Sequence, residues 1–224
     1  MLTSHQPESQ YNPLDELLAR YALGRLDPAL HALVATHLQL KPENRRFVAR
    51  LEELESRELE TGPIEPFAGR DQILNHIFSL PDSSHTKITS AKTSSGLPSA
   101  LSRYIGMDLN SVPWRNRLPG VKEYVIEDIE GRSSSLLLIG AGRAIPSHTH
   151  DGTETTLVLE GAFSDMSGHY GRGDIAFADS DIDHKPIVDR TSDCMCFAVT
   201  EGDLHLTGPF GRIVDRLFGR GRTN

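Results

Sequence analysis

The stretch that decides the fold reads Gly142-Arg-Ala-Ile-Pro-Ser-His148-Thr-His150-Asp-Gly-Thr-Glu154-Thr-Thr-Leu-Val-Leu-Glu-Gly161. His148, His150 and Glu154 share parity, so an extended strand directs their side chains toward one face. Two imidazoles and a carboxylate are suitable ligands for zinc, iron, manganese or nickel. The flanking glycines supply the turns that such strands need. The stretch therefore predicts a metal site built on β-strands.

A fourth ligand is expected from a later strand. Gly173-Asp174 predicts a turn, and His184 follows after enough chain for one strand, a reversal and a return. Pro186, just beyond it, suits the edge of a sheet. The predicted site is therefore His148, His150, Glu154 and His184 around one divalent cation, and these residue types do not select which metal.

The second half of the chain has the pattern of an antiparallel β-structure. Short runs of β-forming residues are punctuated by Gly, Pro, Asp and Ser, as in barrels and sandwiches. These runs are Val121 to Ile126, Ser134 to Ile139, Glu154 to Leu159, Asp174 to Ala178 and Cys194 to Thr200.

The first half has a helical pattern instead. Apolar residues recur at spacings of three and four in four segments. The faces expected for these segments are Leu14, Leu17, Leu18, Tyr21 and Ala22; Leu30, Leu33, Val34, His37 and Leu38; Phe47, Val48, Leu51 and Leu54; and Ile73, Ile77 and Phe78. Asp27 is a candidate N-cap before Pro28, and Pro42 can open the third helix. Such small helices need a partner surface to be well ordered.

The predicted fold is therefore α+β with two domains, a small helical bundle followed by an antiparallel β-barrel. The expected parts are residues 1–80 (helical), 81–98 (polar linker), 99–211 (barrel) and 212–224 (basic tail).

Composition restricts the function. The net charge of −8 argues against non-specific binding to nucleic acid or anionic membranes. Residues 1–13 lack the apolar core of a secretory signal, and no apolar run approaches a membrane span of roughly 20 residues. We therefore expect a cytoplasmic protein, in which the two cysteines stay reduced.

Cys194 and Cys196 share parity on one predicted strand, so both thiols face the same way. If they face inward, they lie near the metal and could sense oxidation or displace a ligand. The alternative is that they act as small buried hydrophobic residues.

The spacing Gly-x5-His-x-His-x3-Glu-x6-Gly resembles the cupin motif, and residues 99–211 resemble the cupin superfamily. This resemblance implies a double-stranded β-helix, or jelly roll, with the four predicted side chains as its metal ligands. Several phrases extend the likeness to nearly the whole chain, which is similar to the ChrR family of anti-sigma factors. They are Val34-Ala-Thr-His37-Leu, Thr156-Leu-Val-Leu-Glu-Gly-Ala-Phe163, Gly173-Asp-Ile-Ala and Asp193-Cys-Met-Cys196.

The resemblance implies that N-terminal helices bind an extracytoplasmic-function sigma factor. It also implies that the metal-bound cupin domain, with zinc as the expected metal, responds to singlet oxygen or related oxidants. Family members carry a second zinc on an upstream His and His-x3-Cys-x2-Cys. Here that run is His37-Leu-Gln-Leu-Lys41-Pro-Glu-Asn44, with His5 as the candidate upstream histidine. An ammonium and an amide replace both thiolates, so no N-terminal zinc is expected.

Two functions stay open. In the first, the helices still bind a sigma factor, and Lys41 pairs with Glu43 or Glu52. In the second, sigma binding is lost, and the chain is a free-standing metal cupin, either a dioxygenase, an isomerase or a small-molecule sensor. No convincing general base lies near the ligands, since Arg143, Asp165 and Tyr170 are more typical of surfaces. This favours a regulatory protein over an enzyme. Pairing of two copies through barrel edges is also possible.

Overall fold

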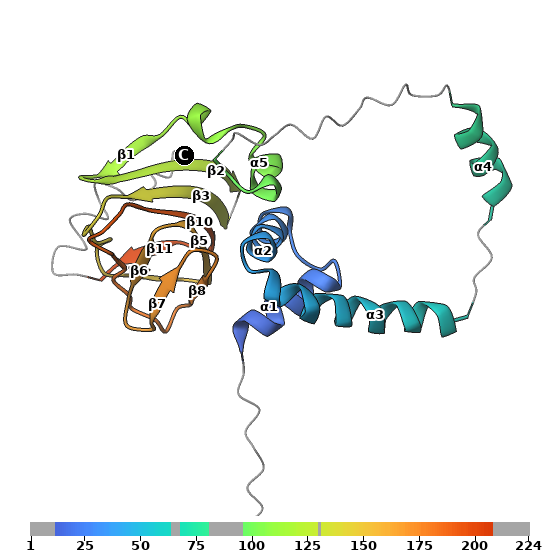
Figure 1. Ribbon diagram of the computed structural model, residues 1–224, viewed down its shortest axis with the longest axis horizontal. Coiled ribbons are helices and arrows are strands. Elements are labelled where there is room, and N and C mark those ends of the chain that lie inside the picture. Colours follow the sequence, from blue (N-terminus) through green and yellow to red (C-terminus); the bar gives the residue numbers. More distant parts are fainter. Residues whose placement is uncertain (1–11, 64–67, 81–95, 130, 208–224) are drawn as a thin grey trace, which may run out of the picture.

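A computed structural model describes residues 12–63, 68–80, 96–129 and 131–207 (Figure 1). Helices occupy the N-terminal part and antiparallel strands the C-terminal part, which confirms the predicted α+β fold. The predicted basic tail, most of the predicted linker and His5 lie outside the described residues.

The N-terminal helices begin where the sequence places their caps. Asn12 caps α1 through a hydrogen bond from the Leu14 amide, and Asp27 caps α2 by accepting from the Ala29 and Leu30 amides. A proline in the first turn of each helix needs no amide donor there. The helices are α1 (Pro13–Ala22), α2 (Pro28–Leu40), the 3-10 turn η1 (Pro42–Asn44), α3 (Arg45–Thr61) and α4 (Arg70–Ser79).

One short helix was not predicted. α5 (Ser99–Ile105) precedes the 3-10 turn η2 (Leu109–Ser111) and packs against α2. Its side chains Leu101 and Ile105 are buried, together with Leu97 just before it. A single seven-residue helix is too short to produce a clear helical period, because its stability comes from packing rather than from propensity.

The strands form three antiparallel sheets. The largest has the order β1-β2-β3-β10-β5-β8, and the smaller ones are β11-β4 and β7-β6-β9. The strands are β1 (Arg115–Leu118), β2 (Val121–Ile129), β3 (Arg132–Ile139), β4 (His148–His150), β5 (Glu154–Glu160), β6 (Ala162–Ser164), β7 (His169–Gly171), β8 (Ile175–Ala178), β9 (Ile187–Val188), β10 (Cys194–Glu201) and β11 (Leu204–Leu206). All five predicted strands are present, and the missed ones are mostly short edge strands.

The large sheet has a different core on each face. Along β5, Val158 joins an inner cluster, whereas Leu157 and Leu159 join an outer one. Along β10, Cys196 faces the inner cluster and Phe197 the outer one. Because side chains alternate along a strand, the two central strands serve both the barrel interior and the layer above it.

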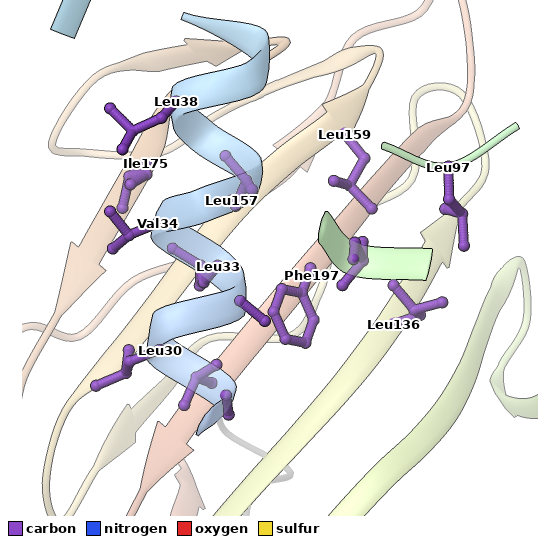
Figure 2. Close-up of a cluster of buried hydrophobic side chains, with 14 of the residues drawn as sticks. Leu30, Leu33, Val34, Leu38, Leu97, Leu136, Leu157, Leu159, Ile175 and Phe197 are labelled. Carbon is purple, nitrogen blue, oxygen red and sulfur yellow. The ribbon is translucent and has the colours of Figure 1, made fainter. Parts of the chain in front are cut away.

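Helix α2 forms that layer. Leu30, Leu33, Val34 and Leu38 point from the helix onto the sheet, where they meet Leu157 and other apolar side chains of the strands (Figure 2). Burial of each such side chain is worth about 1.5–3 kcal/mol relative to exposure. The predicted face of the second helix is therefore confirmed, and its partner surface is the outside of the barrel.

The remaining helices are less buried. In α3, Val48 is buried, but Phe47 and Leu54 of the same expected face are 39% and 58% exposed. Helix α4 has no buried residue. Across the described ranges, none of the helices has the length and apolar character needed to cross a membrane.

Candidate metal centre

The four predicted ligands meet inside the barrel. His148 and His150 are the ends of β4, Glu154 begins β5, and His184 is bridged to His148 by two backbone hydrogen bonds of 3.0 and 3.1 Å. One ligand atom from each of the four lies within 4.8 Å of all the others. This separation allows one cation between them.

The geometry around Glu154 is suited to a cation. Its Oε2 atom lies 2.7 Å from Nε2 of His150, 3.7 Å from Nε2 of His184 and 3.9 Å from Nε2 of His148. The three imidazoles are buried. Oε2 of Glu154 and Nε2 of His150 and His184 have no hydrogen-bond partner of acceptable geometry. Buried polar atoms without partners are costly, and a shared cation would satisfy all of them.

Outer contacts orient the ligands. Nδ1 of His148 donates to the Pro146 carbonyl at 2.8 Å, and Nδ1 of His184 faces Oδ2 of Asp165 at 3.4 Å. Oε1 of Glu154 accepts from Thr156 Oγ1 at 2.8 Å. In these three residues each contact occupies the far atom of the side chain and leaves Nε2 or Oε2 directed at the centre. Nδ1 of His150 is buried without a hydrogen-bond partner among the described residues.

The charges of the site also fit a cation. Burial alone would raise the pKa of Glu154, but the imidazoles of His148 and His150 hold that pKa well below its usual range. Burial and the neighbouring His148 lower the pKa of His184. Burial alone would lower the pKa of His148, but the Glu154 carboxylate raises it, so a metal ion would have to displace a proton from this imidazole.

A small cavity adjoins the cluster. Its volume is about 30 Å³, and apolar side chains such as Leu137, Ile145 and Phe163 line it beside the ligands. Such a volume admits a molecule the size of water.

The cysteines face this interior. Cys194 and Cys196 are buried with their sulfurs 3.5 Å apart, and Cys196 lines the cavity. The contact with Cys194, together with burial, raises the pKa of Cys196 well above its usual range. The raised pKa keeps the thiol of Cys196 protonated, which slows its reaction with those oxidants that attack the thiolate.

The residues of the degenerate N-terminal site have other partners. Nδ1 of His37 donates to the Gly173 carbonyl at 2.7 Å, and Nε2 accepts from Nδ2 of Asn44 at 2.8 Å. Both ring nitrogens are thus engaged, and burial lowers the pKa of His37. Nζ of Lys41 lies 3.0 Å from Oδ1 of Asp174 rather than beside Glu43 or Glu52. This donor set does not fit a metal ion.

One functional residue was misjudged from the sequence. Asp165 was expected at the surface, but its side chain is only 4% exposed and faces His184. Its Oδ1 accepts from the amides of Ser167 and Gly168. The sequence Asp165-Met-Ser-Gly168 is typical of such a turn and could have indicated that this carboxylate is fixed.

Comparisons with known proteins extend over both parts of the chain. A family profile described as "ChrR Cupin-like domain" matches residues 102–203. The anti-sigma-E factor ChrR of Cereibacter sphaeroides is 33% identical over 205 residues, covering 91% of this chain and 95% of that protein. The crystal structure of Rhodobacter sphaeroides SigE in complex with the anti-sigma ChrR is similar with a TM-score of 0.69 and 34% identity. That match covers 84% of this chain and 96% of the other.

Proposed function

This chain belongs to the ChrR family of anti-sigma factors, and we propose that it binds an extracytoplasmic-function sigma factor through its N-terminal helices. The observation that carries this proposal is that the likeness covers 91% of the chain, including the helices as well as the cupin part. The similar solved chain was crystallised in complex with SigE. A sigma factor as partner implies a cytoplasmic protein.

Exposed apolar side chains support a partner at the later helices. Phe47 and Leu54 of α3 are 39% and 58% exposed, and Ile77 and Phe78 of α4 are 52% and 79% exposed. Apolar residues gathered on exposed helices are typical of partner-binding surfaces. The apolar face of α2 is not available in the same way, because the barrel covers it. We therefore assign sigma binding to α3 and α4.

We further propose that His148, His150, Glu154 and His184 hold one divalent metal ion, with zinc as the expected metal. The degenerate N-terminal site around His37, Lys41 and Asn44 holds none. Bound to the four ligands, the cation would cross-link β4, β5 and the segment of His184, without catalytic turnover. The proposed signal is singlet oxygen or a related small oxidant. The cavity of about 30 Å³ supports a small signal, since enzyme substrates usually occupy pockets of several hundred Å³. Cys194 and Cys196 remain candidates for the oxidised groups.

Co-purification tests the sigma-binding proposal. The full chain, tagged, is expected to retain an extracytoplasmic-function sigma factor that is co-expressed with it. Ile77→Asp should abolish retention, because a charge on the α4 surface would be buried without a partner. Met166→Asp is the matched control, since Met166 is 89% exposed on the barrel and should tolerate the charge. Retention by Ile77→Asp equal to that of Met166→Asp would contradict the assignment to α4, and no retention by the wild type would contradict the function.

The same complex tests the role of the metal. Oxidant should release the sigma factor from the wild-type protein, whereas Glu154→Ala should bind it and fail to release it. A normal release from the Glu154→Ala complex would show that the metal site takes no part in sensing.

A further inference from the structure

The C-terminal end of α2 is fixed to the turn between β7 and β8 by polar contacts that the proposed function does not use. His37 donates to the Gly173 carbonyl at 2.7 Å, Asn44 donates to His37 at 2.8 Å, and Lys41 pairs with Asp174 at 3.0 Å. His37 is 2% exposed. Residues far apart in the sequence thus form one polar cluster around the buried His37, with the Lys41–Asp174 pair partly exposed at its edge.

The turn is shaped for close approach. Gly173 has φ +87°, and a Cβ added to it would lie 2.9 Å from Cγ and Cε of Lys41 and 3.0 Å from Cβ of Leu40. A side chain at this position would meet both an unfavourable backbone conformation and the end of α2. The absence of a side chain at Gly173 therefore lets the helix reach the carbonyl that His37 binds.

The other end of α2 and its flank are tied as well. Asp27, the N-cap, lies 3.6 Å from Arg132 at the start of β3. Gln39 donates to Ser99 of α5 at 3.0 Å. These contacts are more exposed than the hydrogen bond between His37 and the Gly173 carbonyl, which is buried. The helix is therefore held along its length, and the buried hydrogen bond of His37 lies toward its C-terminal end.

We propose that the β7–β8 turn binds the C-terminal end of α2 and fixes its position without a metal ion. The contacts are made by His37, Lys41 and Asn44 with Gly173 and Asp174, and we call these five residues the latch. The turn is bonded to β5, because Gly173 donates to the Val158 carbonyl and Val158 donates to the Asp174 carbonyl. Since β5 also carries Glu154, the latch connects the helices to the strand of the metal centre.

Amide hydrogen exchange of the full-length protein tests the latch. The variants are Gly173→Ala and Lys41→Met, with Gly131→Ala as the control. Gly131 also has positive φ, +79°, but an added Cβ there meets nothing within 4 Å. Exchange in residues 36–44 should become about tenfold faster in the two latch variants, the effect of losing a hydrogen-bonded contact, while β3 and β10 stay protected.

Three results would overturn the latch. If the amides of residues 36–44 exchange at the wild-type rate in both Gly173→Ala and Lys41→Met, these contacts do not stabilise the end of α2. An equal increase in the exchange rate of residues 36–44 in Gly131→Ala would show that the effect comes from backbone strain at a glycine and not from the lost contacts. Protection of residues 36–44 by zinc added to the double variant Glu154→Ala, His184→Ala, which lacks two barrel ligands, would show that His37 binds metal after all. Should Gly173→Ala fail to fold, Lys41→Met still decides, because its side chain is 31% exposed and can be shortened without a core defect.

Discussion

At the scale of single residues, Asp165 orients His184 within the proposed metal centre. Oδ2 of the buried carboxylate faces Nδ1 of His184, and Oδ1 accepts hydrogen bonds from the amides of Ser167 and Gly168. A histidine whose Nδ1–H is held by a carboxylate presents a more basic Nε2 to a metal. Asp165 is thus a positioning residue for the centre.

Asp165→Asn should weaken metal binding by about 10- to 100-fold, the usual effect of losing an outer-shell partner. Asparagine keeps an oxygen for the Ser167 and Gly168 amides, so the turn should persist. Competition with a chromophoric chelator measures the affinity. Asp189→Asn is the control, because the Asp189 side chain pairs at 3.1 Å with His169, an exposed histidine that is not one of the four ligands. An affinity for Asp165→Asn within error of that for Asp189→Asn would contradict the positioning role.

At the scale of the elements, α2 is the helix whose packing holds the two parts of the chain together. Leu33 is fully buried between the helix and the sheet. Leu33→Ala should lower the free energy of unfolding by about 2–5 kcal/mol, because it leaves a cavity under the helix. Leu54→Ala, at an exposed site of α3, should change it by no more than about 0.5 kcal/mol. Urea unfolding followed by circular dichroism compares them, and equal effects would contradict the packing role of α2.

The elements also show what sequence reasoning can predict. Alternation located the strands from Val121 onward, because it is a property of neighbouring residues. Parity grouped His148 and His150 correctly on β4, but the expectation that Glu154 shares their strand was wrong, since Glu154 begins β5 in another sheet and meets them only through the fold. The contact of Lys41 with Asp174 was missed, since residues far apart in sequence leave no periodic signal. Asp165 was misjudged for the same reason, because its role depends on the position of His184.

At the scale of the whole molecule, one sheet serves two cores. The inner faces of β5 and β10 enclose the candidate metal centre and the cysteines, and the outer faces support α2. A shift of β5 or β10 at the centre would therefore also change the surface on which α2 packs. This arrangement gives the proposed oxidant signal a physical route, provided that the two states bind the signal differently.

The most direct test of the central claim is the metal content of the purified full-length protein, measured by mass spectrometry with and without the Glu154→Ala and His184→Ala substitutions together. The account predicts about one divalent ion per wild-type chain and almost none in the double variant, because the imidazoles that remain are too few to hold it. An undiminished metal content in the double variant, or a second equivalent in the wild type, would contradict it.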